Sequence, residues 1–271
     1  MEHVKALGAD TIELQRSGFE ADFPVDAIRR ELERLDLGCT LSTSPPRPEL
    51  CLLHEDADAR RAALGYLREA IGVARDLGAG LVVGPLYAPP WWFSGARATP
   101  DQQRWAVEGL QALGPDLWAA GVQLALEPMN RFETFFLNTA AQAVALCAAV
   151  DHAQVGMMLD TAHMAVEETD PCAAMRAAGG WLKHLHLPET DRGTPGTGRL
   201  IDWPGLFAAL ADIGYGGCCA IESLPFEDPE VALKTRSWRD LAPSTDDLAR
   251  DGLAFLKRTW RASLASKHPT P

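Results

Sequence analysis

Four apolar segments between residues 122 and 222 each end in a side chain that can exchange a proton or bind a cation. Those side chains are Glu127, Asp160, His186 and Glu222. Apolar strands that end in Asp, Glu or His are typical of the C-terminal rim of a parallel (β/α) barrel, where active sites lie. The pattern therefore predicts an active site built from the ends of several strands.

The alternation of side chains along these segments favours the same arrangement, because successive side chains of a strand point to opposite faces. The residue before each polar one would face outward and pack on helices: Leu126, Leu159, Leu185 and Ile221. The four polar side chains would then face the barrel axis at one level. His184 would lie one step deeper, so we expect His186 to be functional and His184 to be structural.

Strand and helix patterns alternate along the whole chain and predict an α/β fold, a (β/α)8 TIM barrel around a parallel sheet. The expected strands cover residues 11–15, 39–42, 81–86, 122–126, 155–159, 182–187 and 218–221. The expected helices cover residues 25–37, 56–77, 100–120, 139–150, 171–178, 203–213 and 246–264, after a last helical turn within residues 1–8. Ser244 is expected to cap the final helix.

Only seven strands are expected, whereas a closed barrel of this type has eight. Since the chain begins inside what should be the first helix, the first β-strand is missing from it. Either the true start lies upstream, or the barrel has an open seam that another element covers. A bare strand edge is disfavoured because its unpaired backbone groups invite association.

The composition of the 271-residue chain indicates a cytoplasmic, soluble protein. Its hydrophobic share of 47% is enough for a sizeable core, and no segment has the length and apolarity of a membrane span. The six Cys include no Cys-x-x-Cys pair, which favours reduced thiols over a disulfide or zinc framework. A net charge of −12 opposes binding to nucleic acid, and no membrane partner is expected.

A set of spaced motifs adds a more specific signal. The motifs are EPMNRFE at 127–133, Asn138-Thr139, DTAHM at 160–164 with Glu167-Glu168, HLH at 184–186, RGTPGTG at 192–198 and Trp238-Arg239-Asp240. Together they resemble the ketose 3-epimerases, the D-tagatose 3-epimerase and D-allulose (psicose) 3-epimerase family of xylose-isomerase-like TIM barrels. The resemblance covers roughly residues 6–257 and implies a single barrel domain over residues 1–271.

The resemblance implies a divalent metal ion with four ligands: Glu127, Asp160, His186 and Glu222. Three carboxylates and one imidazole form an oxygen-rich site that suits Mn²⁺, Mg²⁺ or Co²⁺ better than a thiolate-type zinc site, and we expect Mn²⁺. An octahedral ion held by four protein groups keeps two positions open, which O2 and O3 of a ketose would fill.

The implied reaction is epimerisation of free ketoses at C3, such as D-tagatose/D-sorbose, D-fructose/D-allulose or L-ribulose. It breaks a C–H bond beside the C2 carbonyl, and the metal would stabilise the enediolate as a Lewis acid. Glu127 and Glu222 would serve as base and acid on the two faces of C3. The residues that the resemblance assigns to substrate binding are Glu133, His163, His186 and Arg192.

Structural interpretations of single residues remain open. Glu127 or Glu222 alone could be a solvated loop carboxylate, and Asp160 could be a helix cap. Residues 193–198 lack the Lys-Ser/Thr of a phosphate loop, so we interpret them as a turn that positions Arg192. Trp91 and Trp92 could form a wall of the sugar site or pack within a loop.

Two residues depart from the family pattern beside His163. Ala162 stands where a large aromatic side chain is usual, and Ala165 stands where an Asn commonly follows Met164. Both are expected to enlarge or loosen the sugar pocket. The metal chemistry is therefore predicted more firmly than the identity of the ketose.

Other functions on this barrel remain open: an aldose–ketose isomerase, an inosose-type dehydratase, or a non-catalytic sugar-binding protein. A DNA-repair endonuclease of this fold would need a His-rich zinc site and a basic face, which seven His and a net charge of −12 oppose. The expected partners are a small-molecule ketose and further copies of the chain, in a homodimer or homotetramer.

Overall fold

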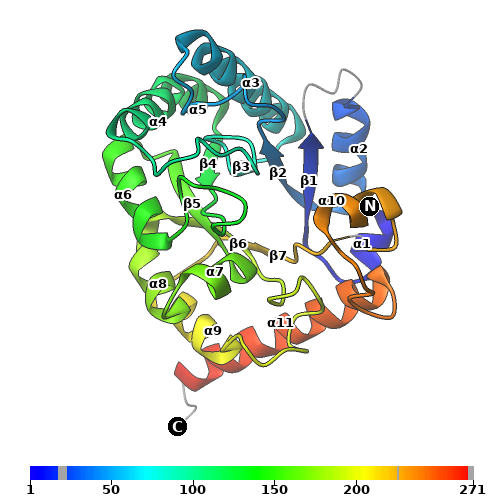
Figure 1. Cartoon of the computed structure of the whole chain (residues 1–271). Coiled ribbons are helices and arrows are strands. Elements are labelled where there is room, and N and C mark those ends of the chain that lie inside the picture. The colour runs from blue at the N-terminus through cyan, green and yellow to red at the C-terminus, as the bar shows by residue number, and fades with distance from the viewer. Residues whose placement is uncertain (18–22, 225, 268–271) are drawn as a thin grey trace.

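Seven parallel strands, paired in sequence order, form the inner wall of a nearly closed barrel (Figure 1). The computed structural model describes residues 1–17, 23–224 and 226–267. The strands are β1 (Thr11–Ser17), β2 (Gly38–Ser44), β3 (Leu81–Gly84), β4 (Gln123–Leu126), β5 (Val155–Asp160), β6 (Leu182–His186) and β7 (Cys218–Ala220). The predicted α/β barrel class is confirmed.

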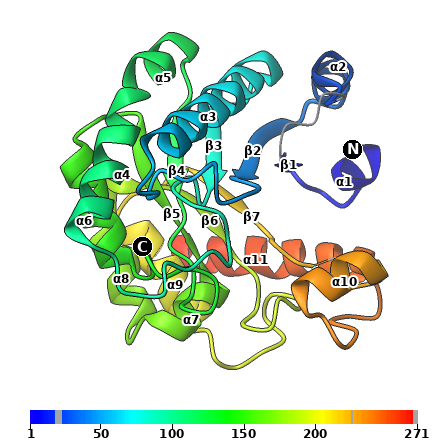
Figure 2. The ribbon, with the colours of Figure 1, turned by 45° about the horizontal axis from the view of Figure 1, so that its top comes forward.

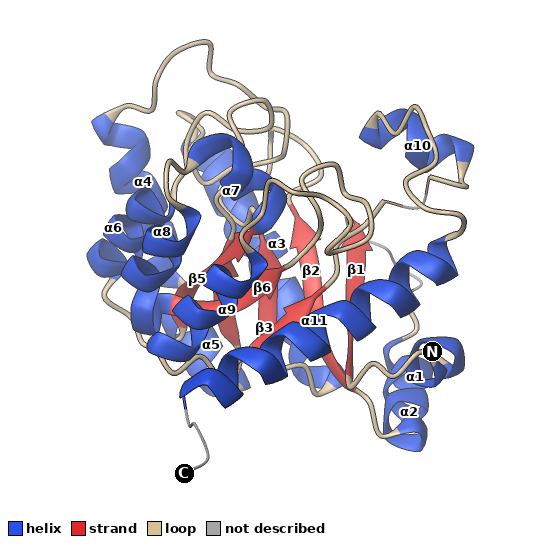
Figure 3. Ribbon diagram, turned by 90° about the horizontal axis from the view of Figure 1, so that it is seen from below, coloured by secondary structure: helices blue, strands red, loops and turns tan. Residues whose placement is uncertain are grey.

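Helices surround the strands on the outside of the barrel (Figure 3). They are α1 (Glu2–Ala6), α2 (Val25–Leu35), α3 (Ala57–Leu77), α4 (Pro100–Ala112), α5 (Gly114–Ala120), α6 (Ala140–Val150), α7 (Thr161–Glu167), α8 (Pro171–Ala178), the 3-10 turn η1 (Gly179–Trp181), α9 (Trp203–Asp212), α10 (Pro229–Thr235) and α11 (Thr245–Lys267). Ser244 caps α11 as predicted, because its hydroxyl accepts the backbone N–H of Asp247 at 3.0 Å. None of the described helices combines the length and apolarity needed to cross a membrane.

The core has the two layers that the side-chain alternation predicts. Leu126, Leu159 and Leu185 belong to a large buried cluster between the strands and the helices. Ala125 and Met158, one residue away on their strands, lie instead in a small separate cluster with Val83. The inner face therefore carries a thin apolar floor, and the polar side chains stand above it at the rim.

Two expectations about helices were wrong. The helix predicted over residues 100–120 is two helices, α4 and α5. Pro115 lies in the first turn of α5 and has no backbone N–H to donate to the preceding turn, so the helix ends before it and a new one begins. Two short helices were also missed, α7 and α10, both near the barrel rim. The start of α7 depends on Asp160, which the sequence presented as the end of a strand.

The barrel is open between β1 and β7, the first and last of its seven described strands. β1 and β7 approach each other there, but no backbone pairing joins them within the described residues. Helix α11 covers part of this side (Figure 2). Lys257 on α11 donates to the carbonyl of Gly8 at 2.6 Å and to Asp10 Oδ2 at 3.0 Å, which ties the helix to the start of β1.

Candidate metal centre

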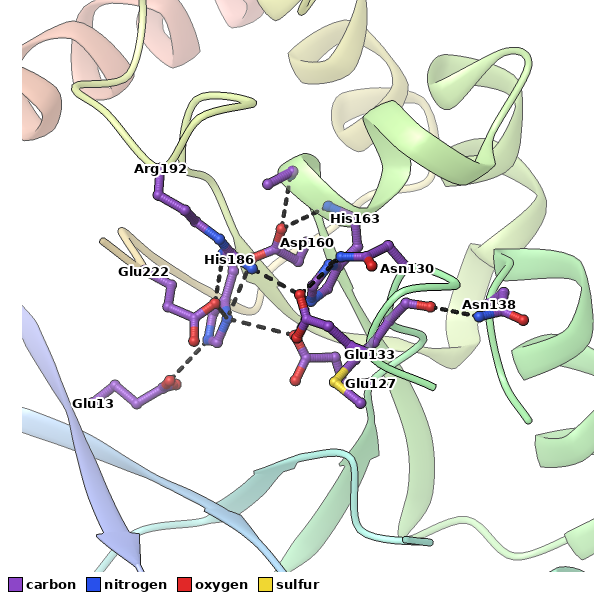
Figure 4. A network of polar contacts seen from close by, with 12 residues as sticks. Glu13, Glu127, Asn130, Glu133, Asn138, Asp160, His163, His186, Arg192 and Glu222 are labelled. Atoms are coloured by element: carbon purple, nitrogen blue, oxygen red, sulfur yellow. Dashed lines mark hydrogen bonds and ion pairs between the residues drawn. The ribbon is translucent and has the colours of Figure 1, made fainter. Parts of the chain in front are cut away.

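The four polar side chains predicted to meet do converge at the barrel rim (Figure 4). Each offers one nitrogen or oxygen atom, and these atoms lie within 4.8 Å of one another. Glu127 follows β4, Asp160 and His186 end β5 and β6, and Glu222 follows β7. Glu222 is the most open of them, with 40% of its side chain exposed, so the group is accessible from that side.

The imidazole of His186 sets the geometry of this group. Its Nδ1 faces the carboxylates, at 3.2 Å from Glu222 Oε2, 3.7 Å from Asp160 Oδ2 and 4.0 Å from Glu127 Oε1. Three carboxylates around one ring nitrogen form a donor set that fits a hard divalent cation such as Mn²⁺ or Mg²⁺. The residues present therefore suit the implied ion, and their role as ligands stays a prediction.

Asp160 combines the two roles that the sequence left as alternatives. Its Oδ1 caps α7 by accepting the backbone N–H groups of Ala162 at 2.7 Å and His163 at 3.1 Å. Its Oδ2 remains directed at the centre. A carboxylate whose first oxygen is fixed by two backbone donors presents the second one in a defined position.

Arg192 is a fifth charged group at the centre. Its Nη1 donates to Asp160 Oδ2 at 2.5 Å and to Glu222 Oε2 at 2.6 Å, while Nη2 lies 3.3 Å from His163 Nε2. The residue has a φ of 65° in the tight turn that the sequence suggested. Bonds to two carboxylates and one imidazole place the guanidinium at the border between the predicted ligands and the neighbouring cavity.

The loop that carries Arg192 is anchored by the buried carboxylate of Glu189. Glu189 Oε1 accepts the backbone N–H of Gly196 at 2.8 Å and the indole N–H of Trp203 at 3.0 Å. A Cβ at Gly198 would lie only 2.4 Å from Glu189 Oε2, so any larger residue there would force the Glu189 carboxylate to move. The Gly-rich segment therefore packs around the carboxylate of Glu189.

A cavity of about 530 Å³ opens beside the centre, and its wall includes Glu133, His163 and Arg192. Asn130 links two of its side chains: its Nδ2 lies 2.9 Å from Glu133 Oε1 and 2.9 Å from His163 Nδ1. The structure thus groups the residues predicted to contact substrate on one side of the predicted ligands. Polar side chains on the wall of a cavity of this size suit a small polyhydroxylated ligand.

The charges around the centre shift the pKa values of Glu127 and Glu222 in opposite directions. Burial, together with the negative charge of Glu222, raises the pKa of Glu127 well above its usual range. Burial acts in the same direction on Glu222, but the positive charges of Arg192 and His186 outweigh it and hold the pKa of Glu222 well below its usual range. For His186 burial favours the neutral ring, yet the carboxylates of Glu222 and Glu13 raise its pKa.

Several motif residues support the centre without touching it. Glu167 accepts the backbone N–H of Arg131 at 2.7 Å and also pairs with its guanidinium. Glu168 accepts the backbone N–H of Ala140 at 2.7 Å, and Asn138 donates to backbone carbonyls of the loop after β4. These contacts fix the loops after β4 and β5 relative to each other, so part of the motif pattern is structural.

Glu13 on β1 is the residue that sequence reasoning missed. Its Oε1 lies 2.8 Å from Nε2 of His186, and its Oε2 lies 2.9 Å from Nε2 of His184. His184 is completely buried, as expected for a structural residue. The one signal in the sequence was a carboxylate at an inward position of the expected strand 11–15, which is an unusual place for a charge without a partner.

Comparison with known proteins identifies the family of this fold and centre. The profile of the family described as "Xylose isomerase-like TIM barrel" matches residues 1–259. The chain belongs to this family. The chain is also 36% identical to a "Probable ketose 3-epimerase" of Synechocystis sp. over 259 residues, which cover 96% of this chain and 89% of that protein. A "D-psicose 3-epimerase" of Ruminiclostridium cellulolyticum is 33% identical over 256 residues, covering 93% and 86%.

Solved structures give the same grouping. A structure titled "Structure of L-ribulose 3-epimerase" superposes with a TM-score of 0.91 at 30% identity, covering 100% of this chain and 92% of that one. A D-psicose 3-epimerase with D-tagatose from Clostridium cellulolyticum H10 has a TM-score of 0.88 at 30% identity, covering 96% and 92%. This xylose isomerase-like barrel is therefore an enzyme of the isomerase class, grouped with the ketose 3-epimerases, as the motif resemblance implied.

The two departures from the motif pattern have different surroundings in this xylose isomerase-like barrel. Ala162 is buried and forms part of the cavity wall. Ala165 is exposed on α7, so the expectation that it loosens the pocket has no contact to support it. Trp92 packs edge-on against Phe135, with ring centroids 5.5 Å apart, which favours the interpretation of loop packing for this tryptophan.

Proposed function

We propose that this protein is a metal-dependent ketose 3-epimerase that acts on free ketoses of the D-fructose/D-allulose, D-tagatose/D-sorbose or L-ribulose type. The ligands of the ion, with Mn²⁺ as the expected metal, are Glu127, Asp160, His186 and Glu222. The observation that carries the proposal is the convergence of three carboxylates and one imidazole beside a cavity of about 530 Å³. A divalent ion held there would supply Lewis-acid polarisation of the carbonyl group of the sugar.

The two glutamates move the proton at C3. Inversion at one carbon requires that a proton leaves from one face and returns to the other, so two separate groups are needed. Glu127 at the end of β4 and Glu222 after β7 approach the centre from different strands. One removes the proton and the other supplies it, and they exchange these tasks when the reaction runs in reverse.

Three side chains of the cavity wall orient the sugar. Glu133 and His163 contact the sugar at its C2 end, and their positions are fixed through the shared contact with Asn130. Arg192 donates to the O1–O3 end, close to the carboxylates that it already contacts. Holding the reacting carbon between two glutamates is the geometric requirement for the proton transfers.

The charge balance of the cavity favours a free ketose over a phosphorylated one. Of the three arginines on the wall, Arg192 donates to two carboxylates and Arg239 pairs with Asp191, while the guanidinium of Arg236 lies 5.9 Å from the centroid of the Trp91 ring. A phosphate group would have to compete with those carboxylates for the guanidinium groups of Arg192 and Arg239. A neutral polyol instead uses hydrogen bonds and leaves the ion pairs intact.

Product analysis tests this function. The protein is incubated with Mn²⁺ and D-fructose, and the sugars are separated by chromatography; D-allulose is the expected product, and a sample stripped of metal is expected to form none. Appearance of D-glucose or D-mannose would indicate an aldose–ketose isomerase. Loss of water from an inosose would indicate a dehydratase, and sugar binding without any product would indicate a binding protein.

A further inference from the structure

Glu13 contacts the side of His186 that faces away from the three carboxylates (Figure 4). The imidazole of His186 lies between Glu13 and Glu222, with Nε2 at 2.8 Å from Glu13 Oε1 and Nδ1 at 3.2 Å from Glu222 Oε2. Only 2% of the His186 side chain and 15% of the Glu13 side chain are exposed. The contact is therefore shielded from water, where a charge-assisted hydrogen bond holds its geometry best.

The two nitrogens of an imidazole have linked roles. When one nitrogen binds a cation through its lone pair, the neutral ring carries its proton on the other nitrogen, and the group that accepts this proton fixes the tautomer and the ring orientation. Glu13 Oε1 is in the position of that acceptor. A carboxylate there also makes the opposite nitrogen a stronger electron donor.

We propose that Glu13 is a positioning residue that accepts the Nε2–H of His186 and thereby directs Nδ1 at the divalent ion. This inference rests on the proposed function, because it presumes that His186 is a ligand. Glu13 itself touches neither the ion nor the sugar. Through Glu13, β1 at the edge of the sheet helps to position a predicted ligand of the centre.

The surroundings of Glu13 are built to hold this carboxylate in one orientation. Its other oxygen, Oε2, accepts the hydroxyl proton of Thr40 at 2.9 Å, and Thr40 lies opposite Glu13 in the β1–β2 pairing. Oε2 also lies 2.9 Å from Nε2 of the buried His184. With Oε2 held by the hydroxyl of Thr40, Oε1 has a defined direction toward His186.

The same three residues, Glu13, His184 and His186, also lie close enough to hold a second cation. The hydrogen bonds of Glu13 to His186 and Thr40 hold the carboxylate in place without one. The two possibilities differ in the number of ions bound per chain. They also differ in whether Nε2 of His186 carries a proton when the first ion is bound.

The test titrates metal-free protein with Mn²⁺ and follows the free ion by electron paramagnetic resonance, which gives both affinity and stoichiometry. Wild-type protein is compared with Glu13→Gln, which keeps the size but not the charge, and with Glu13→Leu, which removes the acceptor. Glu69→Gln is the matched control. Glu69 lies on α3 and pairs with Arg16, which is on the same strand as Glu13 but on its outer face. Circular dichroism confirms that each variant is folded.

We expect one Mn²⁺ per wild-type chain and a loss of affinity of about 10–100-fold in Glu13→Gln, with a larger loss in Glu13→Leu and no change in Glu69→Gln. If Glu13→Leu does not fold, Glu13→Gln still decides. Wild-type affinity in a folded Glu13→Gln protein would overturn the inference. Two ions per chain, one of them lost in Glu13→Gln, would also overturn it in favour of a second metal site.

A second readout separates positioning from general support of the fold. Nitrogen-15 NMR of the Mg²⁺-loaded wild-type protein is expected to show the proton of His186 on Nε2, and no proton on Nδ1. A proton on Nδ1 would contradict the inference. If wild-type protein binds no divalent ion at all, the proposed function fails. If it binds the ion with an affinity that the Glu13 substitutions do not change, only the positioning role of Glu13 fails.

Discussion

A carboxylate oxygen of Glu127 and one of Glu222 lie within 4.8 Å of each other, although the two residues follow different strands of the barrel. Two carboxylates at this distance, one buried and one partly exposed, repel each other unless positive charge lies between or beside them. His186 and Arg192 supply part of that charge. A divalent ion would supply the rest, which links the stability of the centre to its proposed chemistry.

Metal removal is therefore expected to lower the thermal stability. At an ion concentration 100 times the dissociation constant, binding adds about 2.7 kcal/mol to the free energy of unfolding. For a chain of this size that corresponds to roughly 5–10 °C in Tm. Differential scanning fluorimetry with chelator and then with excess Mn²⁺ measures the change. An identical Tm in both conditions would count against the centre.

Replacing either glutamate by its amide should abolish proton transfer. Glu127→Gln and Glu222→Gln keep the shape of the side chain but cannot exchange a proton at C3. We expect kcat to fall by about 10²–10⁴-fold at saturating Mn²⁺. The exposed Glu227→Gln serves as control and is expected to keep wild-type kcat. Near-normal turnover in either site variant would remove that glutamate from the mechanism.

Arg192→Lys tests the forked contact at the edge of the centre. A lysine offers a point charge and cannot donate to Asp160 and Glu222 with the planar geometry of a guanidinium. We expect kcat/KM to fall by roughly 10–100-fold, the equivalent of one to two charge-assisted hydrogen bonds. Arg131→Lys changes an exposed guanidinium outside the centre and keeps the backbone bond to Glu167, so it should change kcat/KM little. Equal losses in the two variants would argue against a specific role for Arg192.

Ala162→Phe tests whether this position shapes the substrate cavity. The added ring enters the cavity wall, so the ratio of kcat/KM for D-fructose over L-ribulose should fall by about 10-fold or more as the longer sugar loses room. Ala165→Phe adds the same ring at an exposed position of α7 and should leave the ratio unchanged. An unchanged ratio in Ala162→Phe would show that the position does not determine chain-length preference.

The sequence predicted the parts of the centre that depend on local pattern. The alternation that buries Leu126, Leu159 and Leu185 also directs Glu127, Asp160 and His186 inward, so a rule of period two placed the three side chains correctly. Such a rule needs no knowledge of distant partners. Register in the parallel sheet then aligned the strand ends at one level, for example Asp160 opposite His186.

Features that depend on distant partners were missed. The role of Glu13 depends on its contacts with His184 and His186, which are far away in the sequence and meet it in the barrel interior. The break between α4 and α5 was readable from Pro115 but was masked by apolar residues that continue on both sides. Helix α10 is short and partly exposed, so hydrophobic periodicity gave no signal for it.

The most direct test of the central claim is isotope exchange at C3. The protein is incubated with Mn²⁺ and D-fructose in D₂O, and the recovered sugars are analysed by NMR and mass spectrometry. The account predicts that deuterium appears at C3, that chelation prevents it, and that Glu127→Gln and Glu222→Gln greatly slow it. Deuterium confined to C1, or no exchange in fully metal-loaded protein that binds the sugar, would contradict it.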